Sequence, residues 1–236
     1  MKNRYFLRKY SATLAIIVAL AVALPLVACA QEPGHSGIIT MTTQAREVRI
    51  AIKLAKGADN LTINWGDGKE SNISDALFNE DFERFVFTHE YSGTTVHNIL
   101  ITGKVTYLNC AGSQLTALDV SRNTTLTELN CGKNQLTALD VSKNTALNGL
   151  ECNFNQIKSL DVSKNTALGV LEIVGNLFTA TALNDLFRTL PDYSKTSDIG
   201  VIYLTERHPL AVGNPGNRDC DRSIALKRGW DFMSIR

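Results

Sequence analysis

The chain repeats itself every 21 residues between positions 105 and 167 of its 236 residues. A shift of 21 positions superposes residues 105–125 on residues 126–146 and again on residues 147–167, and the match fades from Leu168 onward. A fixed period of this length is typical of stacked structural units, each of which buries its apolar side chains against its neighbours. We therefore expect a short solenoid of coils that is stabilised mainly by burial between adjacent coils.

The positions within one unit predict a short strand followed by a turn. Leu129 and Cys131 alternate with Glu128 and Asn130. Because successive side chains of a strand point to opposite faces, the first pair is expected to point inward and the second pair outward. Asn134 follows where the chain must turn out of the strand. Its amide can bond backbone groups of neighbouring coils, which would leave few buried polar groups unpaired.

The spacing Leu-x-x-Leu-x-Cys-x-x-Asn-x-Leu in these units resembles the leucine-rich repeat, which has a length of about 20 to 29 residues. Cys110, Cys131 and Cys152 occupy the same position of successive units. A disulfide or a metal site is one interpretation, but parallel strands aim equivalent side chains in the same direction, and no histidine accompanies the three cysteines. We favour a column of buried apolar thiols, similar to the cysteine ladder of internalin-type repeat proteins. Cys220 is also expected to be a buried thiol.

Residues 1–28 are predicted to be a secretory signal. Four basic residues precede an apolar run at positions 12–24, which is shorter than the roughly 20 residues of a membrane-spanning helix. The sequence from Leu26 to Cys29 resembles the lipobox of bacterial lipoproteins, which implies that Cys29 is acylated and becomes the mature N-terminus. The alternative is an ordinary signal that is cleaved near Ala28 or Ala30. Residues 29–37 are expected to be a flexible tether.

Acylation of Cys29 would hold the protein on a membrane surface without crossing the membrane, because more than one acyl chain gives stable anchoring. The lipobox resemblance implies a bacterial lipoprotein, which we expect in the outer membrane. We expect it at the cell surface rather than in the periplasm.

Residues 38–104 are predicted to form strands separated by turns, as in a small antiparallel β-sandwich. Apolar residues recur at every second position from Val48 to Leu54, which is typical of a strand with one buried face. The segment Trp65-Gly66-Asp67-Gly68, followed by His89-Glu90-Tyr91, resembles the signature of polycystin-type immunoglobulin-like domains. The resemblance implies that Trp65 packs in the core and that residues 66–68 make a turn.

Residues 179–236 are predicted to cap the solenoid, because a stack of coils exposes its apolar core at both ends. We expect a helix that ends before Pro191, a strand over residues 199–204 and a second helix over residues 219–228. The segment from Asn214 to Trp230 resembles the closing segment of leucine-rich-repeat lipoproteins of Gram-negative bacteria. The predicted fold is therefore mainly β with short helices: an immunoglobulin-like β-sandwich (38–104), a leucine-rich-repeat solenoid of parallel strands (105–178) and a mixed α/β C-terminal cap (179–236).

The motifs of common enzymes are not found in the sequence. The four histidines are scattered, no phosphate-binding glycine loop or nucleophile motif is present, and we predict no catalytic residue, metal or cofactor. Asp119, Asp140 and Asp161 could suggest calcium, but they occupy one repeat position, where each is expected to bond turn backbone. The net charge of +1 becomes −3 without the four basic residues of the leader, which argues against nucleic-acid binding.

The outward positions of the predicted strands are the candidate binding residues. They are Tyr107, Asn109, Glu128, Asn130, Glu151 and Glu172, with Phe154 at the edge. Three glutamates on adjacent strands repel one another, and this acidic stripe is either a solvated surface or a recognition face for a basic or hydroxyl-rich partner. We predict a membrane-anchored adhesion or protein-binding module with a protein or glycan partner. The alternative is a non-catalytic structural or accessory subunit of an envelope complex.

Overall fold

The computed structural model describes residues 37–206 and 213–235, which belong to one compact unit. The predicted signal, the lipidation candidate Cys29 and nearly all of the predicted tether lie outside the described residues. Within the described ranges, no helix is long and apolar enough to span a membrane.

Two β-sheets carry most of the fold, so the prediction of a mainly β chain with short helices is confirmed. The five-stranded sheet is antiparallel and has the order β4-β3-β7-β1-β9. Its strands are β1 (Ile38–Thr43), β3 (Thr62–Asn64), β4 (Glu70–Asn72), β7 (His97–Thr102) and β9 (Leu115–Arg122). A single turn of 3-10 helix follows β4 at Ile73–Asp75.

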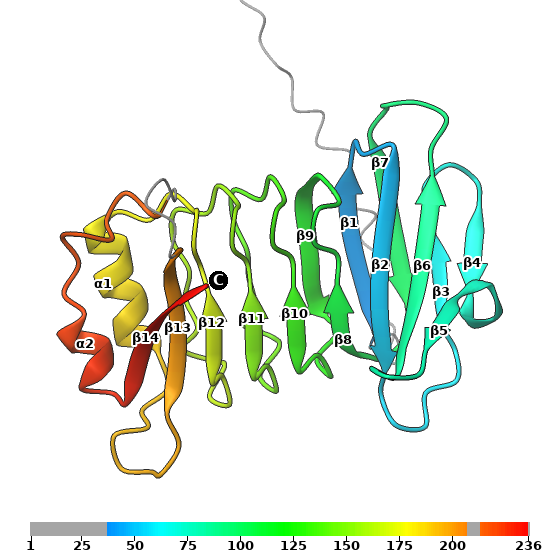
Figure 1. The fold of residues 1–236 in the computed structure, drawn as a ribbon. Coiled ribbons are helices and arrows are strands. Elements are labelled where there is room, and N and C mark those ends of the chain that lie inside the picture. The colour runs from blue at the N-terminus through cyan, green and yellow to red at the C-terminus, as the bar shows by residue number, and fades with distance from the viewer. Residues whose placement is uncertain (1–36, 207–212, 236) are drawn as a thin grey trace, which may run out of the picture. The chain divides into compact units, whose positions relative to one another are not determined.

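The second sheet has nine strands in the order β14-β13-β12-β11-β10-β8-β2-β6-β5. Its strands are β2 (Glu47–Leu54), β5 (Leu77–Asn79), β6 (Arg84–Glu90), β8 (Val105–Asn109), β10 (Glu128–Asn130), β11 (Gly149–Glu151), β12 (Val170–Glu172), β13 (Gly200–Glu206) and β14 (Trp230–Ile235). Strands β8, β10, β11 and β12 come from successive repeats and pair in parallel, as the 21-residue period predicts. Figure 1 shows these strands side by side, with β13 and β14 continuing the row.

Buried asparagines tie each coil to the next. The amide nitrogen of Asn134 donates to the carbonyl oxygens of Cys110 (3.1 Å) and Cys131 (3.0 Å), and its Oδ1 accepts from the backbone N–H of Leu115 (3.0 Å). Asn155 repeats this pattern one coil later. The prediction that these amides satisfy backbone groups of neighbouring coils is confirmed.

The same ladder of asparagines continues into the C-terminal segment. Asn176 donates to the carbonyl oxygens of Cys152 and Ile173, and Asn214 then donates to Ile173 at 2.8 Å although it lies far beyond the last repeat. Asn214 is buried. The C-terminal segment therefore completes the backbone bonding that the last coil would otherwise leave open.

The N-terminal strands and the first coil share both sheets. Strand β8 pairs with β2, and β9 of the same coil pairs with β1, so sheet pairing covers the first coil on its N-terminal side. Trp65 is fully buried, its carbonyl oxygen accepts a 2.8 Å hydrogen bond from the Tyr91 hydroxyl, and its ring stacks on His89. Gly66 and Gly68 have φ values of 79° and 86°. Glycine adopts such positive φ values more easily than other residues, which suits a tight turn. Trp65 and the Gly-Asp-Gly turn thus lie where the sequence predicts them.

The C-terminal segment contains the helices α1 (Ala180–Thr189) and α2 (Ser223–Leu226). The Thr179 hydroxyl caps α1, whose buried face includes Leu183, Leu186 and Phe187, and the helix ends before Pro191 as predicted. The second helix is much shorter than the predicted range 219–228, because turns occupy the first residues of that range, where Asp221 accepts a 3.0 Å hydrogen bond from the Ser223 N–H. Cys220 lies in these turns and is half-buried rather than buried.

Candidate functional site: the outward face of the nine-stranded sheet

The strand register arranges the candidate residues in two columns. One column runs Tyr107, Glu128, Gly149, Val170, and the other runs Asn109, Asn130, Glu151, Glu172. Glu151 and Glu172 are therefore directly opposite each other on neighbouring strands. Glu128 is opposite Gly149 and lies diagonally to Glu151, so the three glutamates do not form the single stack that the sequence suggested.

Arg84 of β6 is a member of this face that the sequence analysis missed. Its guanidinium carbon lies 3.5 Å from the ring centroid of Tyr107, and Nη1 donates a 2.8 Å hydrogen bond to the Tyr107 hydroxyl. Its Nη2 lies 4.0 Å from Oε2 of Glu128. Tyr107 is only 9% exposed, so it is less accessible than the sequence predicts. The 21-residue period could not indicate Arg84, because β6 lies outside the repeats.

A hollow lies over Gly149 in the middle of the face. The side chains around it include the predicted binding residues Tyr107, Glu128, Asn130 and Glu151, together with Asn148 and Val170. A Cβ atom added to Gly149 would come no closer than 3.7 Å to another atom, the Cγ of Glu128, which is an ordinary contact. The fold does not require glycine here, and the absent side chain leaves the hollow open.

Burial and mutual repulsion both act on the carboxyl groups beside the hollow. Burial raises the pKa of Glu151, and the nearby charge of Glu128 raises it further, while the hydrogen bond from Asn130 and the charge of Arg84 partly offset both effects. Burial and the charge of Glu151 raise the pKa of Glu172, whose Oε2 accepts a 3.0 Å bond from Asn153. Among the described residues, no Lys or Arg side chain lies within 4.0 Å of either carboxylate. An external cation placed here would favour the ionised form of both groups.

Three of the predicted residues do not line the hollow: Glu172, which lies beside it on β12, Asn109 and Phe154. Asn109 accepts a 3.0 Å hydrogen bond from the backbone N–H of Ala111, so its side chain shapes the turn after β8. Phe154 follows β11 with a φ of 52° and packs against Gly175, where an added Cβ would lie only 2.5 Å from the ring. Both side chains therefore have structural contacts at the margin of the face.

The three cysteines of the repeats lie at equivalent positions on successive coils. The backbone N–H of each donates to a carbonyl oxygen of the next strand at 2.8 to 2.9 Å: Cys110 to Asn130, Cys131 to Glu151 and Cys152 to Glu172. All three are free and fully buried. Burial raises the pKa of the Cys110 and Cys152 thiols to about 12 and raises that of Cys131 well above its usual value. The predicted column of buried thiols is present.

The aspartates that recur in the repeats bond turn backbone, as predicted. Asp119, Asp140 and Asp161 each accept a 2.8 Å hydrogen bond from the backbone N–H two residues later. This bond lowers the pKa of Asp140 and Asp161 below the ordinary value. In the described ranges, no group of three or more His, Cys, Asp or Glu side chains is placed to hold a metal ion.

Neither a family model nor a curated protein sequence matches this chain. Among solved structures, it is similar to the functional domain of InlJ from Listeria monocytogenes, which includes a cysteine ladder. The two share 25% sequence identity with a TM-score of 0.37, over 55% of this chain and 24% of that chain. The matched part of this chain thus spans about a quarter of that neighbour's length, and the likeness is distant.

Proposed function

We propose that the chain is a lipid-anchored, non-catalytic binding module of the bacterial cell envelope. In this proposal, a leucine-rich-repeat stack presents the outward face of the nine-stranded sheet to a basic segment of a partner protein. An immunoglobulin-like segment over residues 38–104 separates this stack from an acylated Cys29. The 21-residue period, the cysteine column and the lipobox resemblance support this organisation.

The hollow over Gly149 carries the proposal. It places the carboxylates of Glu128 and Glu151 beside an open space, and the register adds Glu172 to the same face. Two carboxyl groups with raised pKa values represent a cost of folding at neutral pH, and a bound ammonium or guanidinium group would reduce this cost. Arg84, which reaches both Tyr107 and Glu128, is an internal example of such a cation on the same face.

The face is longer than the repeats alone would make it. Nine strands at about 4.8 Å spacing extend over about 38 Å, because β2, β6 and β5 continue the sheet at one side and β13 and β14 at the other. Leu77 of β5 pairs with Val86 of β6 and is 76% exposed, so an exposed apolar side chain lies at the far end of the face. A partner segment could therefore combine a basic side chain in the hollow with apolar contacts beyond Arg84.

The second candidate is a structural or accessory subunit of an envelope complex in which this face binds nothing. The hydrogen bonds from Asn130 to Glu151 and from Asn153 to Glu172 favour it, because they satisfy part of each carboxylate within the chain.

Titration of the purified chain with oligolysine, and with oligoglutamine of the same length, separates the two candidates. The binding proposal expects oligolysine to bind and a Glu128→Gln, Glu151→Gln, Glu172→Gln variant to lose about tenfold or more in affinity. A control variant with the same change of charge replaces the exposed residues Asp59, Asp198 and Asp219 by Asn. Equal affinities of the two variants would favour the inert surface.

The proposed anchor has its own test. Replacing Cys29 by Ala is expected to move the protein from the detergent phase to the aqueous phase in a phase-partition experiment, because the acyl chains supply the membrane affinity. Protease treatment of intact cells then tests exposure at the cell surface. Protection of the chain from an external protease would place it in the periplasm and contradict that part of the proposal.

A further inference from the structure

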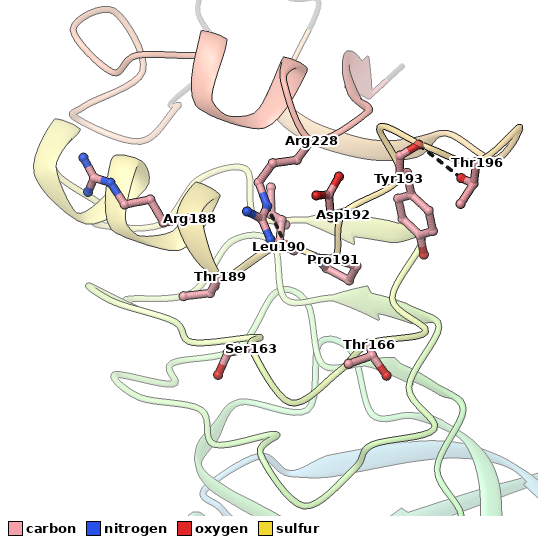
Figure 2. A pocket seen from close by; sticks show the side chains of 10 residues that line it. All are labelled: Ser163, Thr166, Arg188, Thr189, Leu190, Pro191, Asp192, Tyr193, Thr196 and Arg228. Carbon is pink, nitrogen blue, oxygen red and sulfur yellow. Dashed lines mark hydrogen bonds between the residues drawn. The ribbon is translucent and has the colours of Figure 1, made fainter.

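A second cavity lies between a turn of the third repeat and the segment that follows α1. It has a volume of about 440 Å³, within the range of about 300 to 1,000 Å³ that small-molecule sites occupy. Figure 2 shows Ser163 and Thr166 below it and Arg228 above it, with Asp192 and Tyr193 at one side. None of its lining residues lines the hollow over Gly149.

One wall of the cavity is held by hydrogen bonds from the C-terminal segment. Arg228 Nε donates to the carbonyl oxygen of Leu190 and Trp230 Nε1 to that of Pro191, each at 2.8 Å. The backbone N–H of Tyr193 donates to the carbonyl oxygen of Arg228 at 2.8 Å, and the Tyr193 hydroxyl donates to Leu168. Because these bonds hold the segment through contacts within the chain, little ordering would be needed on binding.

The polar groups of the cavity include both donors and acceptors. Among the described residues, Arg228 uses only its Nε–H within the chain, so the two terminal nitrogens of its guanidinium can donate to a ligand. Asp192 is exposed, and its carboxylate interacts with the backbone N–H of Ser194, at 3.0 Å from Oδ1, and with the Ser194 side chain. A carboxylate has about four acceptor positions, so it can still accept from a ligand. Arg188 is ion-paired with Asp185 at 2.6 Å, and its guanidinium points away from the other labelled side chains in Figure 2.

This combination selects for a particular ligand chemistry. Arg228 would repel a cation and Asp192 would repel a simple anion, so neither sign of charge is favoured by both groups. A sugar hydroxyl donates and accepts at the same time and suits the pair, while the Thr166 hydroxyl offers a further contact. The rings of Pro191 and Tyr193, both half-buried, add apolar surface for the carbon face of a sugar ring.

We infer that this cavity binds a neutral saccharide, with Arg228 and Asp192 bonding adjacent hydroxyl groups. The inference does not depend on the strand face, because the two sites share no residue. It gives the chain a glycan site in addition to the proposed protein-binding face.

Saturation-transfer NMR and calorimetry of the purified full chain test this inference with a panel of neutral disaccharides: cellobiose, maltose, lactose and chitobiose. Glucuronic acid and glucosamine serve as charged probes. Asp192→Asn preserves the Oδ1 acceptor for Ser194, so the variant is expected to fold normally, and a thermal melt checks this. Thr166→Val removes one hydroxyl of the cavity. Thr145→Val is its matched control, because Thr145 occupies the same position one repeat earlier and does not line the cavity.

The inference expects at least one neutral disaccharide to bind, with an affinity that falls about tenfold in Asp192→Asn and severalfold in Thr166→Val. Thr145→Val and Glu151→Gln are expected to bind it as the unmodified chain does. Three results would overturn the inference: no binding across the neutral panel, stronger binding of glucuronic acid or glucosamine than of the neutral sugars, or equal affinities of the Asp192→Asn variant and the unmodified chain.

Discussion

The guanidinium of Arg84 covers the ring of Tyr107 at 3.5 Å and bonds its hydroxyl at 2.8 Å. This contact joins β6, which precedes the repeats, to β8 of the first coil. It also places one cation at the edge of the acidic face, where its Nη2 lies 4.0 Å from Glu128. The N-terminal strands thus contribute directly to the electrostatics of the repeats.

Replacing Arg84 by Gln is expected to weaken the fold and strengthen binding of a basic peptide. The loss of the ring contact and the hydrogen bond should lower the free energy of unfolding by about 1 to 2 kcal/mol. Removal of an internal cation makes the face more negative, so the affinity for oligolysine should rise severalfold. Chemical denaturation and calorimetry measure the two effects. A weaker affinity for oligolysine in a variant that is still folded would contradict the idea that the charge of Arg84 opposes binding of a basic peptide.

The raised pKa values of Glu151 and Glu172 make a prediction about pH. A carboxyl group with a raised pKa in the folded state stabilises the fold while it is protonated, and this contribution is lost as pH rises through the folded-state pKa. A Glu151→Gln, Glu172→Gln variant lacks this loss and keeps an acceptor for each asparagine. The melting temperature of the variant, relative to the unmodified chain, should therefore increase between about pH 4 and pH 7. A difference that stays constant or decreases over this range would show that the pKa values are not raised.

The asparagine ladder predicts large and local losses of stability. Asn155→Ala leaves several buried backbone groups without partners and should lower the free energy of unfolding by about 2 to 4 kcal/mol. Asn214→Ala should have an effect of similar size, because its side chain bonds Ile173 and Phe178 at the end of the stack. Gln156→Ala, at an exposed position next to Asn155, is the control and should change little. A small effect of Asn214→Ala on the free energy of unfolding would contradict the claim that the C-terminal segment extends the asparagine ladder.

The column of thiols predicts protection from alkylation. Burial raises the pKa of Cys110 and Cys152 to about 12, so few thiolates exist in the folded chain at pH 8. Cys110, Cys131 and Cys152 should react with iodoacetamide only when the chain unfolds, whereas half-buried Cys220 should react in the folded state. Peptide mass spectrometry at increasing denaturant concentration gives the reactivity of each site. Rapid reaction of Cys131 in the native protein would contradict the packed stack.

The repeats were the most predictable part of the molecule, because a fixed period sets both strand register and side-chain direction. It placed Glu128, Asn130 and Glu151 on one face and correctly assigned Asn134 to backbone bonding. Contacts from outside the period could not be predicted in this way. Arg84 reaches Tyr107 through pairing of β6 with β2 and of β2 with β8, which no local pattern encodes.

The sequence predicted which kinds of elements form the C-terminal segment, but it did not predict which residues connect this segment to the repeats. Apolar spacing and Pro191 indicated α1 and its end, because both are local signals. Helix α1 and strand β13 lie between the last repeat and Asn214, and they interrupt the 21-residue period. The period therefore could not predict that Asn214 belongs to the asparagine ladder. The short α2 and the half-buried Cys220 differ from the predictions because turns replace the expected first helical residues.

The most direct test of the proposed binding face is the affinity of a Gly149→Gln variant for oligolysine. The added side chain fills the hollow without a close contact at Cβ and without a change of charge, so the fold should be retained. Gly93→Gln is the control, because a Cβ at Gly93 also has no close neighbour. The account predicts about a tenfold or greater loss of affinity in Gly149→Gln and no loss in Gly93→Gln. Equal affinities of the Gly149→Gln variant and the unmodified chain would contradict it.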